Sequence, residues 1–372
     1  MRIIILQGAF FPVPPLLGGA VEKMWFRLGQ EFALAGHNVI QISRRHPELK
    51  NLEVICGVQH IRISGYETPA SMPHLKWCDL CYTLRAMPHI KGNADIIVTN
   101  TFWAPPVLSL FSKIPIYVDV ARMPKGQMRL YVGASRLRAN SAAVVSAILR
   151  EWPAAAPKIR MIPNPLPFNS PALGLDIAHK SPTVLYAGRL HEEKGLMLLL
   201  KAWSRLPAKL AAEWKLQIAG SWQVAMGGSG QAFFNKLHSL IGKGHIEFTG
   251  FVQDPSDLNS LYKKASIFVY PSLAESGETF GLSALEAMAW GCVPVVSSMD
   301  CFKDFIHSDI NGLVFDHRAS HAIELLAECL MSLMRHDKKR KKLAAAAMQV
   351  GATHSAPAIA REFLKDFESI LL

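Results

Sequence analysis

The sequence predicts an α/β protein of two domains in tandem, each a parallel β-sheet covered by helices. Three observations lead to this prediction. The chain has 372 residues, and domains of about 100–200 residues suggest two of them. Short apolar runs alternate with helix-like segments along the whole chain, which is typical of repeated βα units. A stretch rich in Pro and Gly, residues 163–182, interrupts this alternation and indicates a linker.

The first half has strand-length apolar runs separated by longer amphipathic segments. A helix is expected from about Ala20 to Ala35, because Gly36 and His37 follow as stop signals. The predicted strands are Ile3–Leu6, Val39–Ile42, Ile61–Ile63, Ile96–Val98, Ile116–Val120 and Val144–Val145.

The second half repeats the alternation after the linker. Its predicted strands are Thr183–Ala187, Lys215–Ala219, His245–Phe248, Ser266–Tyr270, Val293–Ser297 and Gly312–Val314. Its predicted helices are Leu196–Leu206, Gly230–Ile241, Asp257–Ala265 and Leu282–Ala289.

The expected organisation is therefore two Rossmann-like domains that face each other across a cleft. The boundaries are 1–165 for the first domain, 166–182 for the linker and 183–355 for the second domain. Residues 356–372 are expected to form a helix that packs back toward the first domain. Ligands of open α/β sheets bind beyond the carboxyl ends of strands, so the loops after strands are the places to look for chemistry.

Composition and charge exclude several classes of protein. Half of the residues are hydrophobic, so the chain is not disordered. No apolar run approaches the roughly 20 residues of a membrane span. The net charge is +11 and is uneven: residues 1–180 have 20 Lys and Arg against 10 Asp and Glu, and residues 181–372 have 20 against 19. An anionic partner of the first half is expected, such as a membrane surface, a phosphorylated substrate or nucleic acid.

The cysteines and the N-terminus predict a cytoplasmic protein. The six Cys are irregularly spaced, which argues against a disulfide scaffold. Cys78 and Cys81 form a lone CxxC that is best interpreted as one face of a helix, with a metal or redox site as the less favoured alternative. The apolar run Ile3–Leu6 is too short for a signal peptide.

Two segments have the residue types of phosphate-binding sites, in which the backbone or a cationic side chain contacts the phosphate. Gly18 and Gly19 follow the first strand and open the first helix, which allows close approach of a ligand, although a glycine pair is also typical of a plain turn. Arg189 and Lys194 follow the strand Thr183–Ala187. Two cations there suit a diphosphate, and ordinary surface charges of a βα loop are the alternative.

The most informative segment is Pro271–Val296. Glu278 lies in a loop before the helix that Gly281 opens, and Glu286 lies on that helix. Carboxylates accept hydrogen bonds from vicinal sugar hydroxyls, and the exposed amides expected at Phe280, Gly281 and Leu282 can donate to an anion. An ordinary helix with one polar face is the alternative, but the apolar neighbours make a buried glutamate unusual.

Together these segments resemble the retaining nucleotide-sugar glycosyltransferases of family 4, also called group 1, which have the GT-B fold. Pro271–Val296 resembles the family signature, and Ala187-Gly-Arg-Leu followed by Gly195 resembles its diphosphate loop. Gly-Gly-Ala-Val-Glu, Ala-Gly-His-Asn-Val and Ile162-Pro-Asn resemble N-terminal family motifs. The resemblance covers nearly the whole chain and is strongest in residues 183–315.

The resemblance implies a role for each matching residue. Arg189, Lys194 and Glu278 would form the catalytic set, in which the two cations hold the leaving diphosphate. By the same resemblance, Phe251 and Val252 would lie near the nucleotide base. The residues implied to bind the donor are Gly19, Val252, Phe280, Gly281, Leu282 and Glu286. No metal or other cofactor is expected, because the nucleotide-sugar is a substrate and cations and a helix dipole stabilise its diphosphate.

One departure concerns the acceptor side. The family often has a His after a strand of the first domain, where this chain has Ala121. Asp119, Arg122 and Lys125 are therefore the candidates for acceptor binding. The expected acceptor is a saccharide, a lipid-linked or a phosphorylated molecule, and the basic first half would meet an anionic membrane surface on its inner face. No nucleic-acid partner is expected.

The predicted reaction is transfer of a sugar from a UDP-sugar, or alternatively a GDP-sugar, to an acceptor hydroxyl with retention. Polysaccharide, lipopolysaccharide or glycolipid biosynthesis is the expected setting. One alternative is a GT-B nucleotide-sugar 2-epimerase. Another is a degenerate GT-B module that binds anionic lipid.

Overall fold

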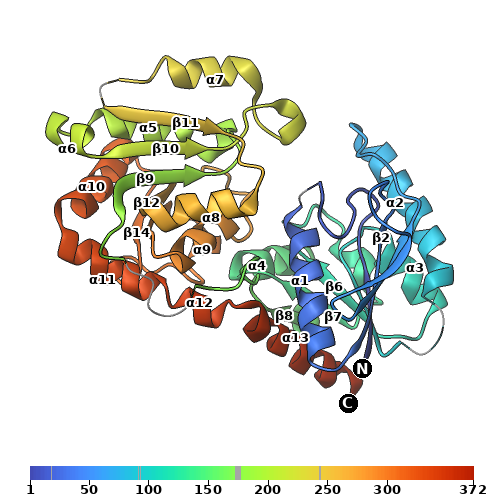
Figure 1. Cartoon of the computed structure of the whole chain (residues 1–372). Coiled ribbons are helices and arrows are strands. Elements are labelled where there is room, and N and C mark those ends of the chain that lie inside the picture. Colours follow the sequence, from blue (N-terminus) through green and yellow to red (C-terminus); the bar gives the residue numbers. More distant parts are fainter. Residues whose placement is uncertain (18, 91, 93, 172–176, 243) are drawn as a thin grey trace. The chain divides into compact units, whose positions relative to one another are not determined.

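The computed structural model divides into two compact units (Figure 1). It describes residues 1–17, 19–90, 92, 94–171, 177–242 and 244–372. The first unit is Met1–Phe168 with His354–Leu372, and the second is Asn169–Thr353. Residues 172–176 of the expected linker lie outside the described part.

The first unit is built on an eight-stranded sheet of order β3-β4-β2-β1-β5-β6-β7-β8. Every neighbouring pair is parallel except β3 with β4. Runs of Ile and Val form the central strands, as expected where helices cover both faces of a sheet. The strands are β1 (Arg2–Leu6), β2 (Asn38–Arg44), β3 (Leu52–Ile55), β4 (Val58–Ile63), β5 (Ile96–Thr99), β6 (Ile116–Val120), β7 (Arg136–Ala139) and β8 (Ile159–Met161).

Helices cover both faces of this sheet (Figure 1). Ile3 and Ile5 pack with α1 (Ala20–Leu34) and α13 (Ala356–Leu371). The alternate residues Ile4 and Leu6 share a core with buried residues of the remaining helices of the unit, as the two-residue period of a strand requires. Those helices are α2 (Met72–Ala86), α3 (Ala104–Phe111) and α4 (Ala142–Glu151).

The predicted strand Val144–Val145 is wrong, because both residues lie in α4. The Ser141 hydroxyl accepts a hydrogen bond from the Val144 amide at 3.2 Å and so caps the helix. Val144 and Ile148, one helical turn apart, are both buried. A short apolar run does not distinguish a strand from a buried helix, and the strand of this region is β7.

The C-terminal helix α13 lies beside α1 in the first unit (Figure 1). Phe363 packs edge-on against Trp25, and the Tyr117 hydroxyl donates to Asp366 Oδ2 at 2.9 Å. Arg136 pairs with the other oxygen of Asp366 at 3.1 Å. A buried, satisfied carboxylate thus holds the end of the chain against β6 and β7.

The second unit has a six-stranded, fully parallel sheet of order β11-β10-β9-β12-β13-β14. The strand order reverses between β9 and β12, and open α/β sheets bind ligands at such a point. Its strands are β9 (Ser181–Ala187), β10 (Lys215–Ala219), β11 (His245–Gly250), β12 (Ala265–Tyr270), β13 (Val293–Ser297) and β14 (Leu313–Phe315). Its helices are α5 (Leu196–Ser204), α6 (Ala208–Glu213), α7 (Gly230–His238), α8 (Pro255–Lys264), α9 (Leu282–Ala289), α10 (Ala322–Arg335), α11 (Asp337–Ala347) and α12 (Val350–Thr353).

The two units differ in charge. The first has 21 Lys and Arg against 12 Asp and Glu, a net of +9, and the second has 19 against 17, a net of +2. In the described part of the chain, none of the helices combines the length and apolarity needed to cross a membrane.

Candidate active site

Two loops of the second unit bring Lys194 and Glu278 into contact at the point where the strand order reverses. Lys194 follows β9 at the end of a short 3-10 turn (Glu192–Lys194), and Glu278 follows β12. The Lys194 Nζ lies 2.7 Å from Glu278 Oε2, and their side chains are only 7% and 12% exposed. Ser272 Oγ donates to the same carboxylate oxygen at 3.4 Å. The structure therefore joins two predicted catalytic residues that are 84 positions apart.

The backbone holds these two loops close together. The Leu273 amide donates to the Glu193 carbonyl at 2.7 Å. Gly195 has a φ of 69°, and a Cβ there would lie 1.9 Å from the Pro271 carbonyl oxygen. Only glycine allows this approach. Gly195 of the predicted diphosphate loop is therefore required for the close packing of the two loops.

Arg189 is the accessible cation of the site. Its side chain is half exposed, donates to the Gly227 carbonyl at 2.8 Å and pairs with Glu193 at 3.2 Å. These bonds leave part of the guanidinium fork free for an anion. A planar fork and a point charge such as Lys194 together suit the oxygens of a diphosphate.

Two buried tyrosines lie under the ion pair. The rings of Tyr186 and Tyr270 stack with centroids 5.8 Å apart, and the Lys194 ammonium lies 5.4 Å from the centre of the Tyr270 ring. Burial, with the Glu278 carboxylate nearby, raises the pKa of Tyr270 well above its ordinary value of 10. Tyr270 therefore stays protonated beside the ion pair. No motif predicted this support.

The helix α9 begins where the signature predicted. Gly281 is its N-cap, with a φ of 84°, and a Cβ there would lie 2.2 Å from the Phe302 ring. Phe280 is buried against Phe305, with ring centroids 5.2 Å apart. First-turn amides lack intrahelical partners, so the Leu282 and Ser283 amides are the donors of this helix end, whereas the Ala284 amide donates to the Gly281 carbonyl at 3.0 Å.

Glu286 lies on α9 and is held by a buried tyrosine. The Tyr262 hydroxyl donates to Glu286 Oε2 at 3.2 Å. Burial, with the neighbouring Glu286 charge, raises the pKa of Tyr262 well above 10, which keeps it a donor. The carboxylate of Glu286 is thus oriented by the protein.

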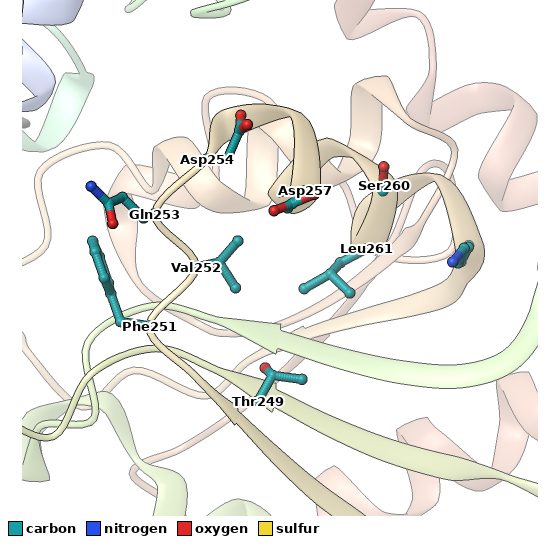
Figure 2. A pocket seen from close by; sticks show the side chains of 9 residues that line it. Thr249, Phe251, Val252, Gln253, Asp254, Asp257, Ser260 and Leu261 are labelled. Atoms are coloured by element: carbon teal, nitrogen blue, oxygen red, sulfur yellow. The ribbon is translucent and has the colours of Figure 1, made fainter.

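A cavity of about 780 Å³ lies between the carboxyl end of β11 and α8 (Figure 2). Figure 2 shows the side chains of Val252 and Leu261 facing the same space, with Asp257 above them. Asp254 also lines it and caps α8 through the Ser256 amide at 2.8 Å. Lys264 lines the cavity as well, and apolar walls with a few charged groups of both signs suit an uncharged ring that carries hydrogen-bond donors and acceptors.

The predicted acceptor-binding residues of the first unit differ in their exposure to solvent. Arg122 and Lys125 are exposed in the loop after β6. Asp119 is fully buried, and its carboxylate accepts from Trp25 Nε1 and from Arg138 Nη1, each at 2.8 Å. Since both oxygens are used inside the protein, Arg122 and Lys125 are better placed to contact an acceptor.

The buried Arg138 side chain donates hydrogen bonds to the Ile162-Pro-Asn segment. Its Nε donates to the Ile162 carbonyl at 2.7 Å and its Nη2 donates to Asn164 Oδ1 at 2.8 Å. The asparagine therefore completes a buried ion pair. Sequence reasoning missed this role because a buried arginine has no distinctive local pattern.

The glycine pair lies only in part within the described residues, which exclude Gly18. Gly19 has a φ of 94° and precedes α1. A Cβ at Gly19 would lie 2.1 Å from a Glu22 carboxylate oxygen. Glu22 is buried, and this burial raises its pKa above the ordinary 4.5.

No cluster of three or more His, Cys, Asp or Glu side chains that could hold a metal ion occurs in the described ranges of the chain.

Comparisons with known proteins concern the family and the fold. Residues 174–350 match the family model described as glycosyl transferases group 1. The chain is 24% identical over 333 residues to the lipopolysaccharide 1,2-N-acetylglucosaminetransferase of Salmonella typhimurium, covering 84% of each protein. It is 28% identical over 191 residues to the phosphatidyl-myo-inositol mannosyltransferase of Mycobacterium leprae, covering 50% of this chain and 46% of that protein.

Solved structures give the same fold. Sucrose-phosphate synthase of Thermosynechococcus elongatus superposes with a TM-score of 0.81 at 20% identity, covering 100% of this chain and 99% of that one. Anabaena HepE in complex with UDP and glucose superposes with a TM-score of 0.70 at 18% identity, covering 99% of this chain and 100% of that one. The fold is therefore that of the GT-B glycosyltransferases, and the predicted resemblance to group 1 glycosyltransferases is confirmed over residues 174–350, which match the model of that family.

Proposed function

We propose that this glycosyltransferase moves a sugar from a nucleotide-diphosphate donor to an acceptor hydroxyl with retention at the anomeric carbon, and that the transferred sugar is a hexose. The observation that supports this best is the 2.7 Å contact between Lys194 Nζ and Glu278 Oε2, next to the exposed fork of Arg189. A diphosphate needs paired cations as it leaves, and a sugar needs a carboxylate for its hydroxyls.

In this proposal the ion pair prepares the site for the transition state. Arg189 and Lys194 bind the diphosphate and stabilise the negative charge that grows on it as the glycosidic bond breaks. Glu278 holds Lys194 and accepts hydrogen bonds from donor-sugar hydroxyls. The amides at Phe280, Gly281 and Leu282 reach the phosphate or the sugar, and Gly19 is a further donor-binding residue in this proposal.

The nucleoside would bind the second unit near Glu286. Glu286, oriented by Tyr262, would accept from the ribose hydroxyls. The cavity beside Val252 would take the base. UDP is the favoured nucleotide, with GDP as the alternative, and Anabaena HepE with bound UDP supports this choice by analogy.

The acceptor is proposed to bind the first unit near Arg122 and Lys125. The names of the Salmonella and mycobacterial relatives support a lipopolysaccharide or glycolipid acceptor. The net charge of +9 on the first unit favours association with an anionic membrane surface at the cytoplasmic side. No metal is proposed to take part.

The test is a nucleotide and donor screen of the purified chain. UDP and UDP-sugars should raise the melting temperature, since a ligand at 100 times its dissociation constant adds about 2.7 kcal/mol of stability. Donor turnover should survive EDTA and should be lost in Glu278→Gln and Lys194→Met. NMR of the transferred sugar should report a retained anomeric configuration.

The outcomes separate the alternatives. If the donor is epimerised at C2 without any acceptor, the chain is a nucleotide-sugar 2-epimerase and the proposed transferase activity is refuted. Full turnover in Glu278→Gln, or no stabilisation by any nucleotide, would refute the proposed donor site. Binding to vesicles without any nucleotide response would favour a lipid-binding module.

A further inference from the structure

A second cavity of about 550 Å³ lies in the first unit at the carboxyl end of β4. Its walls are Leu52 of β3, Ile61 and Ile63 of β4, and the segment around Arg45 that follows β2. Arg85, near the end of α2, and His89 complete it. None of these residues belongs to the predicted active site.

Its exposed charges are all positive. Arg45 and Arg85 are exposed, and the lining residues in the described part of the chain include no acidic side chain. Arg85 donates one long hydrogen bond of 3.3 Å to the Ser64 carbonyl and lies 5.0 Å from the centre of the Tyr66 ring. The Arg45 side chain has no hydrogen-bond or ion-pair partner among the described residues. Two guanidinium forks are therefore available to a ligand.

A third arginine makes the base of the cavity rigid. Arg62 is 1% exposed. Its Nε donates to the Val13 carbonyl at 2.8 Å, and its Nη1 bonds with the Lys50 carbonyl and Glu53. Glu53 balances this buried charge, so the binding charges are those of Arg45 and Arg85, with His89 as an additional donor.

These two cavities differ in the charges of their lining residues. Asp254, Asp257 and Lys264 line the cavity of the second unit, and their net negative charge does not favour an anion. The cavity of the first unit favours one, because arginine forks match the geometry of phosphate oxygens. Its volume exceeds that of a phosphate and lies in the range of small-molecule sites, about 300–1,000 Å³. The apolar side chains of Leu52 and Ile61 offer a surface to the organic part of such a ligand.

The position of the cavity relates it to the proposed acceptor side. The strands β4, β2 and β1 are parallel neighbours, so the cavity, Gly19 and Arg122 all lie at the carboxyl edge of one sheet. Building on the proposed function, we infer that this cavity is a subsite for a phosphate group of the acceptor. The Arg45 and Arg85 guanidinium groups bind the phosphate, and the His89 ring donates a hydrogen bond to it.

The test compares two double variants of the full chain with the same charge change. Arg45→Gln/Arg85→Gln removes both forks. Arg150→Gln/Arg160→Gln removes two exposed arginines of the same unit that do not line the cavity. The probe is glucose 6-phosphate, titrated by calorimetry at low salt with and without saturating UDP. Glucose is the uncharged comparison.

The wild type and the Arg150/Arg160 variant should bind glucose 6-phosphate equally, and the Arg45/Arg85 variant should bind it at least about tenfold more weakly. Equal binding by all three proteins would overturn the inference. So would equal losses in both variants, which would mean a general charge effect, or equal binding of glucose and glucose 6-phosphate. His89→Gln is a milder variant that should give a smaller loss in the same direction.

Two further arms separate the sources of the phosphate and the two proposals. Phosphatidic acid vesicles replace glucose 6-phosphate in one arm, and loss of vesicle binding specific to Arg45→Gln/Arg85→Gln would assign the site to a lipid phosphate. UDP binding is measured on the same proteins. Phosphate binding without UDP binding would refute the proposed donor site and keep this subsite, and the reverse would refute the subsite alone.

Discussion

The Lys194 ammonium and the Glu278 carboxylate form a nearly buried ion pair, 2.7 Å apart, between the loops that follow β9 and β12. Charges so placed cost desolvation and need good geometry to be tolerated. Ser272 supplies a further hydrogen bond to the carboxylate, and the Tyr270 ring lies beside the ammonium. The pair thus holds a cation in a fixed position before any ligand arrives, which is the arrangement that electrostatic catalysis requires.

A double-mutant cycle on this pair should give a large coupling. Lys194→Met or Glu278→Gln alone leaves the partner buried and uncompensated, so each should lower the free energy of unfolding by about 3 kcal/mol. The double variant should lose much less than the sum, with a coupling of about 1–3 kcal/mol measured by urea denaturation. The exposed pair Lys209–Glu213 is the matched control, with an expected coupling of about 0.3–0.5 kcal/mol. Equal couplings in the two cycles would contradict the argument.

Arg189→Lys should weaken UDP binding by about tenfold while leaving stability within about 0.5 kcal/mol. The side chain is half exposed, so the fold depends on it little, whereas lysine cannot reproduce a two-pronged grip on phosphate oxygens. Calorimetric titration with UDP measures the affinity. Arg205→Lys, at a more exposed position of the same unit, should not change it; the prediction is wrong if both variants bind UDP like the wild type.

Asp119→Ala should act through stability and not through acceptor affinity. It leaves Arg138 buried with an unpaired charge and removes the acceptor of the Trp25 indole, which should cost about 3–5 kcal/mol in urea denaturation. Arg122→Gln, at an exposed position, should change stability by less than about 0.5 kcal/mol and raise the KM for the acceptor instead. A raised KM with unchanged stability in Asp119→Ala would return that residue to the acceptor site.

Gly281→Ala should destabilise the second unit more than Gly250→Ala. Both glycines have positive φ, 84° and 72°, so both variants have similar backbone strain, about 1–2 kcal/mol. Only at Gly281 would the new Cβ also meet a side chain, the Phe302 ring at 2.2 Å, whereas nothing lies within 4 Å at Gly250. The comparison by thermal unfolding isolates the steric contribution, and equal losses would show that the helix start of α9 adjusts freely.

Asp79→Asn should remove a pH dependence of stability. Burial raises the pKa of Asp79 from 3.8 to about 6, although it accepts a hydrogen bond from the Trp103 amide at 2.9 Å. Between these pH values the folded state binds more protons than the unfolded state, so this group's contribution falls as pH rises from about 4 to 6. The variant should therefore be more stable than the wild type at pH 7, by up to about 3 kcal/mol, and should match it near pH 4. Parallel stability curves from pH 4 to 7 would contradict this.

Much of the fold followed from local pattern. Strands such as Lys215–Ala219 and Val293–Ser297, and the helix Leu282–Ala289, have the predicted bounds, because periodicity and flanking glycines report local geometry directly. The predicted strand Val144–Val145 is wrong because the Ser141 cap and the helical spacing of the buried residues outweigh its strand-like composition. Of the site, the sequence predicted the residue types at Arg189, Lys194, Glu278 and Glu286, whereas the supporting Tyr262 and Tyr270 belong to no motif.

What the sequence by itself determined is the class of protein, because glycines, cations and carboxylates at the ends of strands are fixed in spacing along one chain. Only the tertiary structure decided which of these charges face a ligand. Asp119 and Arg122 are three positions apart, yet one is buried in an ion pair and the other is exposed. Arg45 and Arg85 are far apart in sequence and line one cavity. The physical reason is that the free energy of a charge depends on burial and partners, and strand pairing and helix packing bring those partners from distant parts of the chain.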